Sequence, residues 1–185
     1  MKTSWRNHRG PIDHGFTVLE ILLVISIVAV VLVMGIPSFR DFGLRQRMSA
    51  AIDNLHGHLA LARHEAINRN TQVVACPGNR TTGCANSTDW SNGWIVFSDL
   101  NGDRQYQAGE ILHRVEIGQE LLVIHSSPGR TNLRFYPNGS APGSNGSITF
   151  CDLRGPEHAR KLVISNIGRI RRDDAPELDP SHCPP

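Results

Sequence analysis

The chain has 185 residues, of which 39% are hydrophobic and 19% charged, with 19 Lys plus Arg against 17 Asp plus Glu. This length suits one globular domain, its apolar content excludes a wholly disordered chain, and a single long apolar run excludes a polytopic membrane protein. Residues 1–15 carry three basic side chains and one acidic one, so residues 16–185 hold 16 of each sign. Attraction to a polyanion must therefore come from a local patch.

The longest apolar run covers residues 16–36 and contains one ionisable side chain, Glu20. About 20 apolar residues in a helix cross a bilayer core, so residues 16–37 are predicted to span a membrane. A secretory signal peptide would end in small residues, whereas this run ends in Met34, Gly35, Ile36 and Pro37. A plain anchor leaves Glu20 unexplained, because a carboxylate in hydrocarbon costs about 2.5 to 3.5 kcal/mol. Glu20 needs a partner.

A short basic leader precedes an uninterrupted apolar helix. The junction between them reads Gly15-Phe16-Thr17-Val18-Leu19-Glu20. This junction resembles the class III signal of type IV pilins and type II secretion pseudopilins. The resemblance implies that a prepilin peptidase removes residues 1–15 after Gly15 and methylates Phe16, and that Glu20 lies near the amino group of a neighbouring subunit. A buried carboxylate beside an ammonium is compensated. Pro37 matches the position of a helix-kinking proline in that family.

A second apolar pattern covers residues 38–71. Apolar residues recur there at steps of three and four, which predicts an amphipathic continuation of the helix; they are Leu44, Met48, Ile52, Leu55, Leu59, Ala62 and Ala66. We expect one helix from Phe16 to about Asn70. At 1.5 Å per residue it would be about 80 Å long, too long to lie within a compact domain.

Residues 72–172 read as a β-rich head. Short β-branched or aromatic segments alternate there with Gly, Pro, Asn and Ser, which predicts strands at 72–76, 93–99, 110–117, 121–125, 132–136, 147–151 and 161–166. The expected fold class is α+β, with a mainly antiparallel sheet packed on the amphipathic half of the helix, as in the type IV pilin fold. Residues 137–146 are predicted to form a loop, and residues 173–185 a polar tail.

The head carries its own resemblance. A Cys-Pro pair follows the first predicted strand, a Gly-Trp-Ile-Val-Phe segment and an Asn-Gly turn come next, and Gly168-Arg169-Ile170-Arg171 comes late in the chain. This order resembles the GspH/FimT class of minor pilins and pseudopilins.

The four cysteines all lie in the part that a membrane anchor would place outside the cytoplasm. An even number in an oxidising compartment favours disulfides. We favour Cys76 with Cys84, which closes a short loop, and Cys151 with Cys183, which would hold the tail. A zinc site is the competing interpretation, although no CxxC pair is present and the spacing is irregular.

Oxygen-bearing side chains follow one another between residues 99 and 110. Asp99, Asn101, Asp103 and Glu110 occupy positions 1, 3, 5 and 12 of a calcium-loop pattern. Arg104 stands where that loop requires glycine, so a polar hairpin turn is favoured over a weak metal site.

A basic cluster near the C-terminus is the main functional candidate. Its members are Arg154, Arg160, Lys161, Arg169, Arg171 and Arg172. In a strand, Arg169 and Arg171 would project from one face and could bind successive phosphates. The Gly-Arg-x-Arg motif resembles the DNA-binding element of FimT-type minor pilins that assist natural transformation. The resemblance implies backbone contacts by Arg169 and Arg171, with Arg172, Lys161 and Arg160 as accessories.

The alternative is that this cluster is neutralised by the chain itself. Asp173, Asp174, Glu177 and Asp179 follow the last arginine at once and could pair with it and its neighbours. DNA binding, if present, should lack sequence preference and weaken steeply with salt, because no base-reading motif is evident.

Enzyme motifs are incomplete or missing. The segment from His64 to Asn68 approaches HExxH but has asparagine in place of the second ligand, so His56, His58 and His64 read as polar helix residues. We therefore expect a non-enzyme without cofactors, which is itself a substrate of a peptidase.

Three functions remain open. In the first, which we favour, the chain is a minor type IV pilin that joins or primes a pilus with other pilins and captures DNA. It would pass once through the inner membrane, with its head in the periplasm, before reaching the pilus at the cell surface. The second is an H-type minor pseudopilin of a type II secretion system with no DNA role. The third is a membrane-tethered calcium or ligand-binding module that never polymerises.

Overall fold

The computed structural model describes residues 15–118, 121–174 and 183, apart from the side chains of residues 34–38. The chain divides into two compact units, residues 1–40 and 41–185, which are treated separately below. Most of the expected leader, residues 1–14, lies outside the described residues.

One helix, α1 (Val18–Arg69), contributes to both units. It begins at Val18 because the Thr17 hydroxyl accepts a hydrogen bond from the Glu20 backbone N–H at 3.2 Å, which caps the first turn. It ends where Asn70 adopts a left-handed conformation with φ of 50° and the Thr71 N–H donates to the carbonyl of Ala66. The helix predicted for residues 16–70 is therefore confirmed to within two residues at either end.

The first unit is a helix whose apolar side chains are exposed. From Phe16 to Val33 every large hydrophobic side chain is at least 49% exposed, and Phe16 itself is 77% exposed. Among the described residues, no helix combines the length and apolar character that a membrane crossing requires. The membrane span expected at residues 16–37 is thus not confirmed.

In the second unit, α1 presents the predicted amphipathic stripe. Met48, Ile52, Leu55 and Leu59 are buried, and Ala62 and Ala66 continue the same line of fully buried residues. Leu44 is half-buried at its start. The stripe spaced at three and four residues is confirmed.

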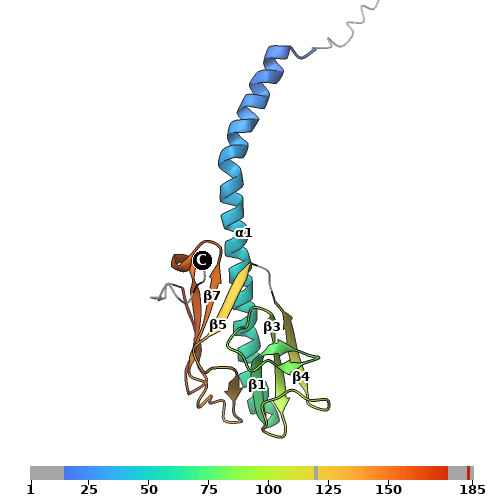
Figure 1. The fold of residues 1–185 in the computed structure, drawn as a ribbon, viewed down its shortest axis with the longest axis vertical. Coiled ribbons are helices and arrows are strands. Elements are labelled where there is room, and N and C mark those ends of the chain that lie inside the picture. The colour runs from blue at the N-terminus through green and yellow to red at the C-terminus, as the bar shows by residue number, and fades with distance from the viewer. Residues whose placement is uncertain (1–14, 119–120, 175–182, 184–185) are drawn as a thin grey trace, which may run out of the picture. The chain divides into compact units, whose positions relative to one another are not determined.

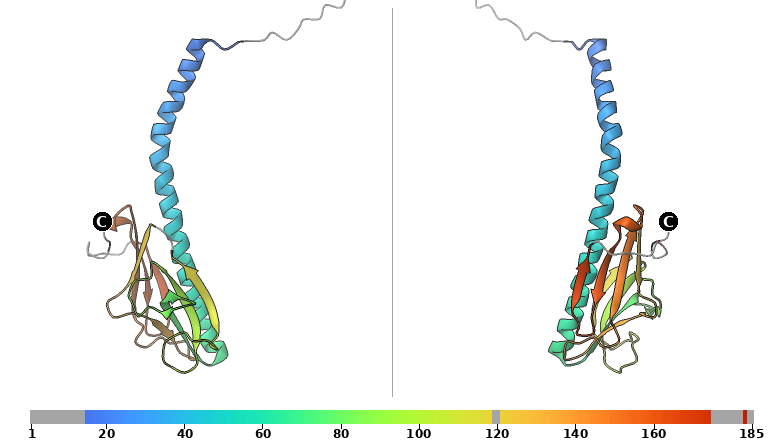
Figure 2. Two further views of the ribbon diagram at one scale, coloured as in Figure 1. Left: turned by 45° about the vertical axis from the view of Figure 1, so that its right-hand side comes forward. Right: turned by 90° about the vertical axis from the view of Figure 1, so that its left-hand side faces the viewer.

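The head contains two antiparallel sheets (Figures 1 and 2). The first sheet has the order β2-β1-β3-β4, and β6 also pairs with β1; its strands are β1 (Gln72–Asn79), β2 (Gly83–Cys84), β3 (Gly93–Asp99), β4 (Leu112–Ile117) and β6 (Leu133–Phe135). The second sheet has the order β5-β7-β8-β9, with strands β5 (Leu122–Ser126), β7 (Gly146–Asp152), β8 (Arg160–Ile164) and β9 (Ile170–Asp173). A short 3-10 helix, η1 (Pro156–His158), joins β7 to β8.

The sequence predicted one sheet of seven strands, and that detail is wrong. Two strands were missed: β2 has only two residues, and β9 reads Ile-Arg-Arg-Asp, which carries no apolar alternation. The seven predicted strands correspond to the others with shifts of a few residues at their ends. The α+β class and the type IV pilin arrangement of a long helix on an antiparallel head are as predicted.

The two sheets share one core because both pack on the helical stripe. The main cluster joins Ile52, Leu55 and Leu59 of α1 to buried residues of both sheets, including Val96 of β3 and Phe150 of β7. In Figure 1 the strands β1, β3 and β4 lie on one side of this part of α1, and β5 and β7 on the other. A smaller cluster lies among Val74, Cys76, Ile95 and Phe97 of the first sheet.

All four cysteines form the two predicted disulfides. Cys76 bonds Cys84, eight residues further on, and Cys151 bonds Cys183, 32 residues further on. The second bond attaches Cys183 to β7, next to the buried Ala159.

Residues 99–110 form a polar turn between β3 and β4. Asp99 accepts hydrogen bonds from the backbone N–H groups of Gly102 and Arg104, at 2.8 and 3.2 Å, and from the Gln72 amide at 2.8 Å. Glu110 likewise accepts from the N–H groups of Leu100 and Gln107. The carboxylates thus organise the turn, as favoured from the sequence. Within the described chain, no group of three or more His, Cys, Asp or Glu side chains is placed to hold a metal.

Candidate nucleic-acid interface

The hairpin formed by β8 and β9 divides the predicted basic patch into two faces. Paired residues of an antiparallel sheet project to the same face, and successive residues to opposite faces. Arg172 pairs with the buried Leu162, and therefore faces α1 together with Ile170. Arg171 pairs with Val163 and projects to the other face of the sheet.

Arg171 and Lys161 belong to this outer face, and Asp173 stands there as the cross-strand partner of Lys161. Arg169 precedes β9 in the turn at the edge of the sheet, next to α1. Lys161 lies two residues from Val163 on β8, and Arg169 lies two residues from Arg171, immediately before β9. Arg169 and Arg171 are exposed, and neither guanidinium makes an ion pair or hydrogen bond with a described residue. The outer face and the adjoining turn therefore present one guanidinium group each, and neither group is paired with a described residue.

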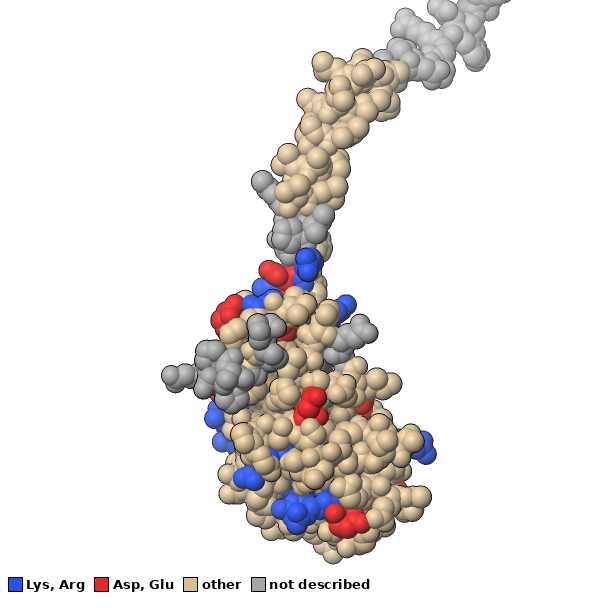
Figure 3. Space-filling model, in the orientation of Figure 1, with Lys and Arg blue, Asp and Glu red and all other residues tan. Residues whose placement is uncertain are grey.

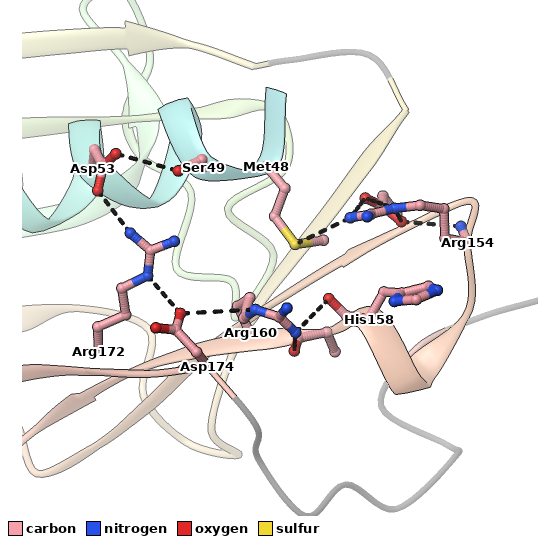
Figure 4. Close-up of polar contacts among 10 residues, drawn as sticks. Met48, Ser49, Asp53, Arg154, His158, Arg160, Arg172 and Asp174 are labelled. Atoms are coloured by element: carbon pink, nitrogen blue, oxygen red, sulfur yellow. Dashed lines mark hydrogen bonds and ion pairs between the residues drawn. The ribbon is translucent and has the colours of Figure 1, made fainter. Parts of the chain in front are cut away.

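Arg172 and Arg160 instead belong to the inner face, where carboxylates hold them (Figure 4). Arg172 donates to Asp53 of α1 at 3.0 Å and to Asp174 at 2.6 Å. Arg160 lies 3.7 Å from the same Asp174 carboxylate. The neutralisation considered from the sequence thus applies to Arg160 and Arg172 through Asp174, and Asp173 lies on the outer face opposite Lys161. Glu177 and Asp179 lie outside the described residues.

The turn that carries Arg169 depends on a glycine. Gly168 has φ of 77° and is buried, and its N–H donates to the carbonyl of Ser165 at 2.8 Å. A β-carbon at this position would lie 2.1 Å from the carbonyl oxygen of Gly139. The neighbouring Asn166 carbonyl accepts from the Ala141 N–H at 2.8 Å, which fastens the hairpin turn to the loop at 137–146. Glycine is therefore the residue that permits both the backbone conformation and this close approach.

A cleft of about 400 Å³ lies where α1 meets this turn. Its polar lining comprises Arg169 from the turn and Arg63, His56 and His64 from the helix. Arg63 donates through Nε to the Gly139 carbonyl at 2.9 Å, which fixes the guanidinium beside the turn. No sequence pattern indicated this role for Arg63, since only the fold brings residue 63 next to residue 169.

In the space-filling view, Lys and Arg side chains appear on the side of the second sheet, and also at the lower middle and the opposite edge of the head (Figure 3).

A buried polar relay crosses the head from α1 to β3. The Ser98 hydroxyl and His113 Nε2 are 2.9 Å apart, and His113 Nδ1 is 3.8 Å from a Glu65 carboxylate oxygen. Burial lowers the pKa of His113, an effect that Glu65 partly offsets, and a hydrogen bond from Arg69 lowers the pKa of Glu65. The order of groups resembles a serine nucleophile with its base, but Ser98 is fully buried and beyond the reach of a substrate.

The incomplete HExxH segment is also explained. His64 shares a hydrogen bond of 2.7 Å with Asn68, and Glu65 is held by Arg69. His58 Nδ1 accepts from the buried Trp94 indole at 3.1 Å, and burial lowers the pKa of His58. These histidines thus stabilise the helix and its packing.

At the N-terminal end, Gly15, Phe16 and the capping Thr17 precede α1, and Glu20 occupies its first turn. Phe16 and Glu20 line a hollow of about 250 Å³ with Ile21 and Val24. The residues expected to be cut, methylated and used in assembly therefore lie together on the first unit.

The long capped helix, the antiparallel head and the disulfides define a type IV pilin-like protein. A family model described as Type II transport protein GspH matches residues 51–168, so the chain belongs to the GspH family of minor pilins and pseudopilins. It is 32% identical over 163 residues to "Pilin-like protein PilA1" of Thermus thermophilus, and the match covers 85% of this chain and 96% of that protein.

Two crystal structures of the type IV minor pilin FimU from Pseudomonas aeruginosa share the fold. Their TM-scores are 0.55 and 0.58, at 22% and 23% sequence identity. The matches cover 70% and 74% of this chain and 97% of each FimU chain. This similarity concerns the fold alone.

Replacing Gly168 with alanine should displace the turn that carries Arg169. The new methyl group would meet the Gly139 carbonyl, so we expect the free energy of unfolding to fall by about 2 to 3 kcal/mol. Gly129→Ala is the matched control, since Gly129 has φ of 76° with no atom within 4 Å of its β-position. It should lose only about 1 kcal/mol. Equal losses in denaturant titrations of the two variants would show that the close approach has no energetic consequence.

Proposed function

We propose that this protein is a minor type IV pilin that joins other pilins in a filament and binds DNA without sequence preference during DNA uptake. The observation that carries the DNA role is the pair of exposed guanidinium groups of Arg169, in the turn before β9, and Arg171, on the outer face of β9, neither of which has an ion pair with a described residue. Guanidinium groups bind phosphate through paired N–H donors, and contacts to phosphate alone convey no base sequence.

The proposed surface is larger than the two arginines of the motif. Lys161, on the adjacent strand, adds a basic side chain to the face of Arg171, and Asp173 stands opposite it across the strands. Arg63 and the two histidines of the neighbouring cleft, His56 and His64, extend the polar surface onto α1. Arg160 and Arg172 are left out of this surface, because Asp53 and Asp174 hold them on the opposite face.

The proposal for assembly rests on the first unit. A prepilin peptidase would cut after Gly15 and methylate Phe16, and residues 16–37 would anchor the protein in the inner membrane with its head in the periplasm. The exposed apolar side chains of this helix need lipid or neighbouring pilins to cover them. Glu20 would then lie near the amino terminus of an adjacent subunit in the filament. The two disulfides fit an oxidising compartment.

The second candidate is a minor pseudopilin of a type II secretion system with no DNA role. The description of the matching family model favours it. The name of the Thermus thermophilus relative favours a pilus instead. Neither candidate is an enzyme, since both act through assembly.

The DNA role is tested by charge removal at matched positions. Arg169→Gln with Arg171→Gln should weaken binding of the full chain, in detergent micelles, to a random duplex by tenfold or more. Loss of two phosphate contacts should also reduce the slope of log affinity against log salt by about 2. The control pair, Arg80→Gln with Arg104→Gln, removes the same charge from exposed positions elsewhere on the head. Fluorescence anisotropy that showed equal losses for both pairs would leave only a general charge effect and refute the proposed face.

Assembly is tested by replacing Glu20 with alanine in the native host. Loss of the carboxylate should remove the attraction to the neighbouring amino terminus, so we expect the variant to be absent from sheared filaments. Asp41→Ala, at another exposed acid of the same helix, should still be incorporated. Mass spectrometry of the membrane-bound variant should show a chain beginning at methylated Phe16, which separates a failure of assembly from a failure of cleavage. Normal incorporation of the Glu20→Ala protein would contradict the proposal.

A further inference from the structure

A basic cavity lies on the inner side of the β8–β9 hairpin, apart from the proposed DNA face. It has a volume of about 260 Å³ and is lined by Arg45, Gln46, Met48 and Ser49 of α1, with Arg154, Arg160 and Arg172 from the second sheet and its β7–β8 connection. Four arginines thus line one small space, and none of its described lining residues is acidic (Figure 4 shows three of these arginines).

Three of the arginines retain donors that no described residue accepts from. Arg154 is bonded to Asp152 through Nε and Nη2, while Arg160 uses Nη1 for the carbonyls of His158 and Ala159. Arg172 uses Nε and Nη1. In each of these three side chains, one Nη group has no hydrogen-bond acceptor among the described residues. Such N–H groups favour an oxyanion that can accept from several of them at once.

Asp174 shows how an oxyanion is held here. One of its carboxylate oxygens lies 2.6 Å from Arg172 Nε and 3.7 Å from Arg160 Nε, so a single oxygen bridges two guanidinium groups. Asp174 is 61% exposed and follows the last strand directly, so nothing in its packing requires this position. Its carboxylate is an internal anion bound at the rim of the cavity.

The local charges leave an excess for a further anion. The four arginines carry +4, and the carboxylates bonded to them, Asp53, Asp152 and Asp174, carry −3. Arg154 and Asp152 form a largely buried pair, with side chains 9% and 0% exposed, and are fixed in place. If Asp174 moves away, the net charge of the site rises by one, and the Nε groups of Arg160 and Arg172 become available to another anion.

We propose that this cavity binds a phosphate group and that Asp174 competes with it for Arg160 and Arg172. A phosphate offers three or more oxygens to convergent donors, whereas a carboxylate offers two. The cavity is too small for a duplex, so its ligand is a single phosphate, either a free ion or the headgroup of a lipid. The inference does not depend on the proposed DNA role, which uses Arg169 and Arg171.

The test is the thermal stability of the full chain in detergent micelles as phosphate replaces chloride at constant ionic strength. A ligand that binds the folded state raises the melting temperature as the ligand concentration increases. The titration curve gives the phosphate concentration at which the site is half-saturated. Asp174→Asn removes the competing charge while keeping a similar shape, so half-saturation should fall to about a tenth of the wild-type concentration. Arg160→Gln with Arg172→Gln should abolish the phosphate-dependent rise, whereas Arg169→Gln with Arg171→Gln should retain it.

The source of the phosphate is distinguished by repeating the titration with glycerol 3-phosphate, the soluble headgroup of an anionic lipid that ends in a phosphomonoester. A lower half-saturating concentration of this monoester assigns the site to a lipid headgroup, and a lower half-saturating concentration of inorganic phosphate assigns it to a free ion. A melting temperature that neither compound raises would overturn the proposal. An Asp174→Asn protein with unchanged or weaker half-saturation would overturn it as well, even if the double arginine variant failed to fold.

Discussion

The structure of the head depends on the burial of one helical stripe. Met48, Ile52, Leu55 and Leu59 of α1 pack against both antiparallel sheets, which form a single main core with the helix. Truncation of any fully buried leucine in this stripe to alanine is expected to cost about 2 to 5 kcal/mol. Because both sheets are packed against the same helix, the helix also fixes where each strand of the second sheet presents its side chains.

Side chains alternate between the two faces of β9, and this alternation decides which arginines face α1 and which face outward. The inward direction of Ile170 and Arg172 follows from packing against α1, so Arg171 must project outward. A shift of register by one residue would exchange the two sets, placing the arginines now paired with Asp53 and Asp174 on the outside. One hairpin thus supplies an outer face on which Arg171 has no described ion pair, and an inner face whose arginines are paired with carboxylates but retain donors for a small oxyanion.

Much of this arrangement could be predicted from the sequence because the signals were local. The stripe follows from a spacing of three and four residues, and the nearness of Arg169 to Arg171 follows from their spacing of two. The division into two sheets could not be predicted, since strand order depends on pairings between distant segments. The same holds for the pair of Arg172 with Asp53, which are 119 residues apart, and for Arg63 beside Gly168. β9 was missed because its one apolar residue gives no periodic pattern.

The most direct test of the two-faced hairpin is a chemical-shift titration of the isotope-labelled chain in micelles with a short random duplex. The account predicts that perturbed backbone signals cluster at the outer face and the adjoining turn, on Lys161, Val163, Arg169 and Arg171. Signals of the first sheet, such as those of β4, should remain unchanged. Perturbations confined to β4 or to the polar turn at residues 99–110, with the hairpin signals unmoved, would contradict the account.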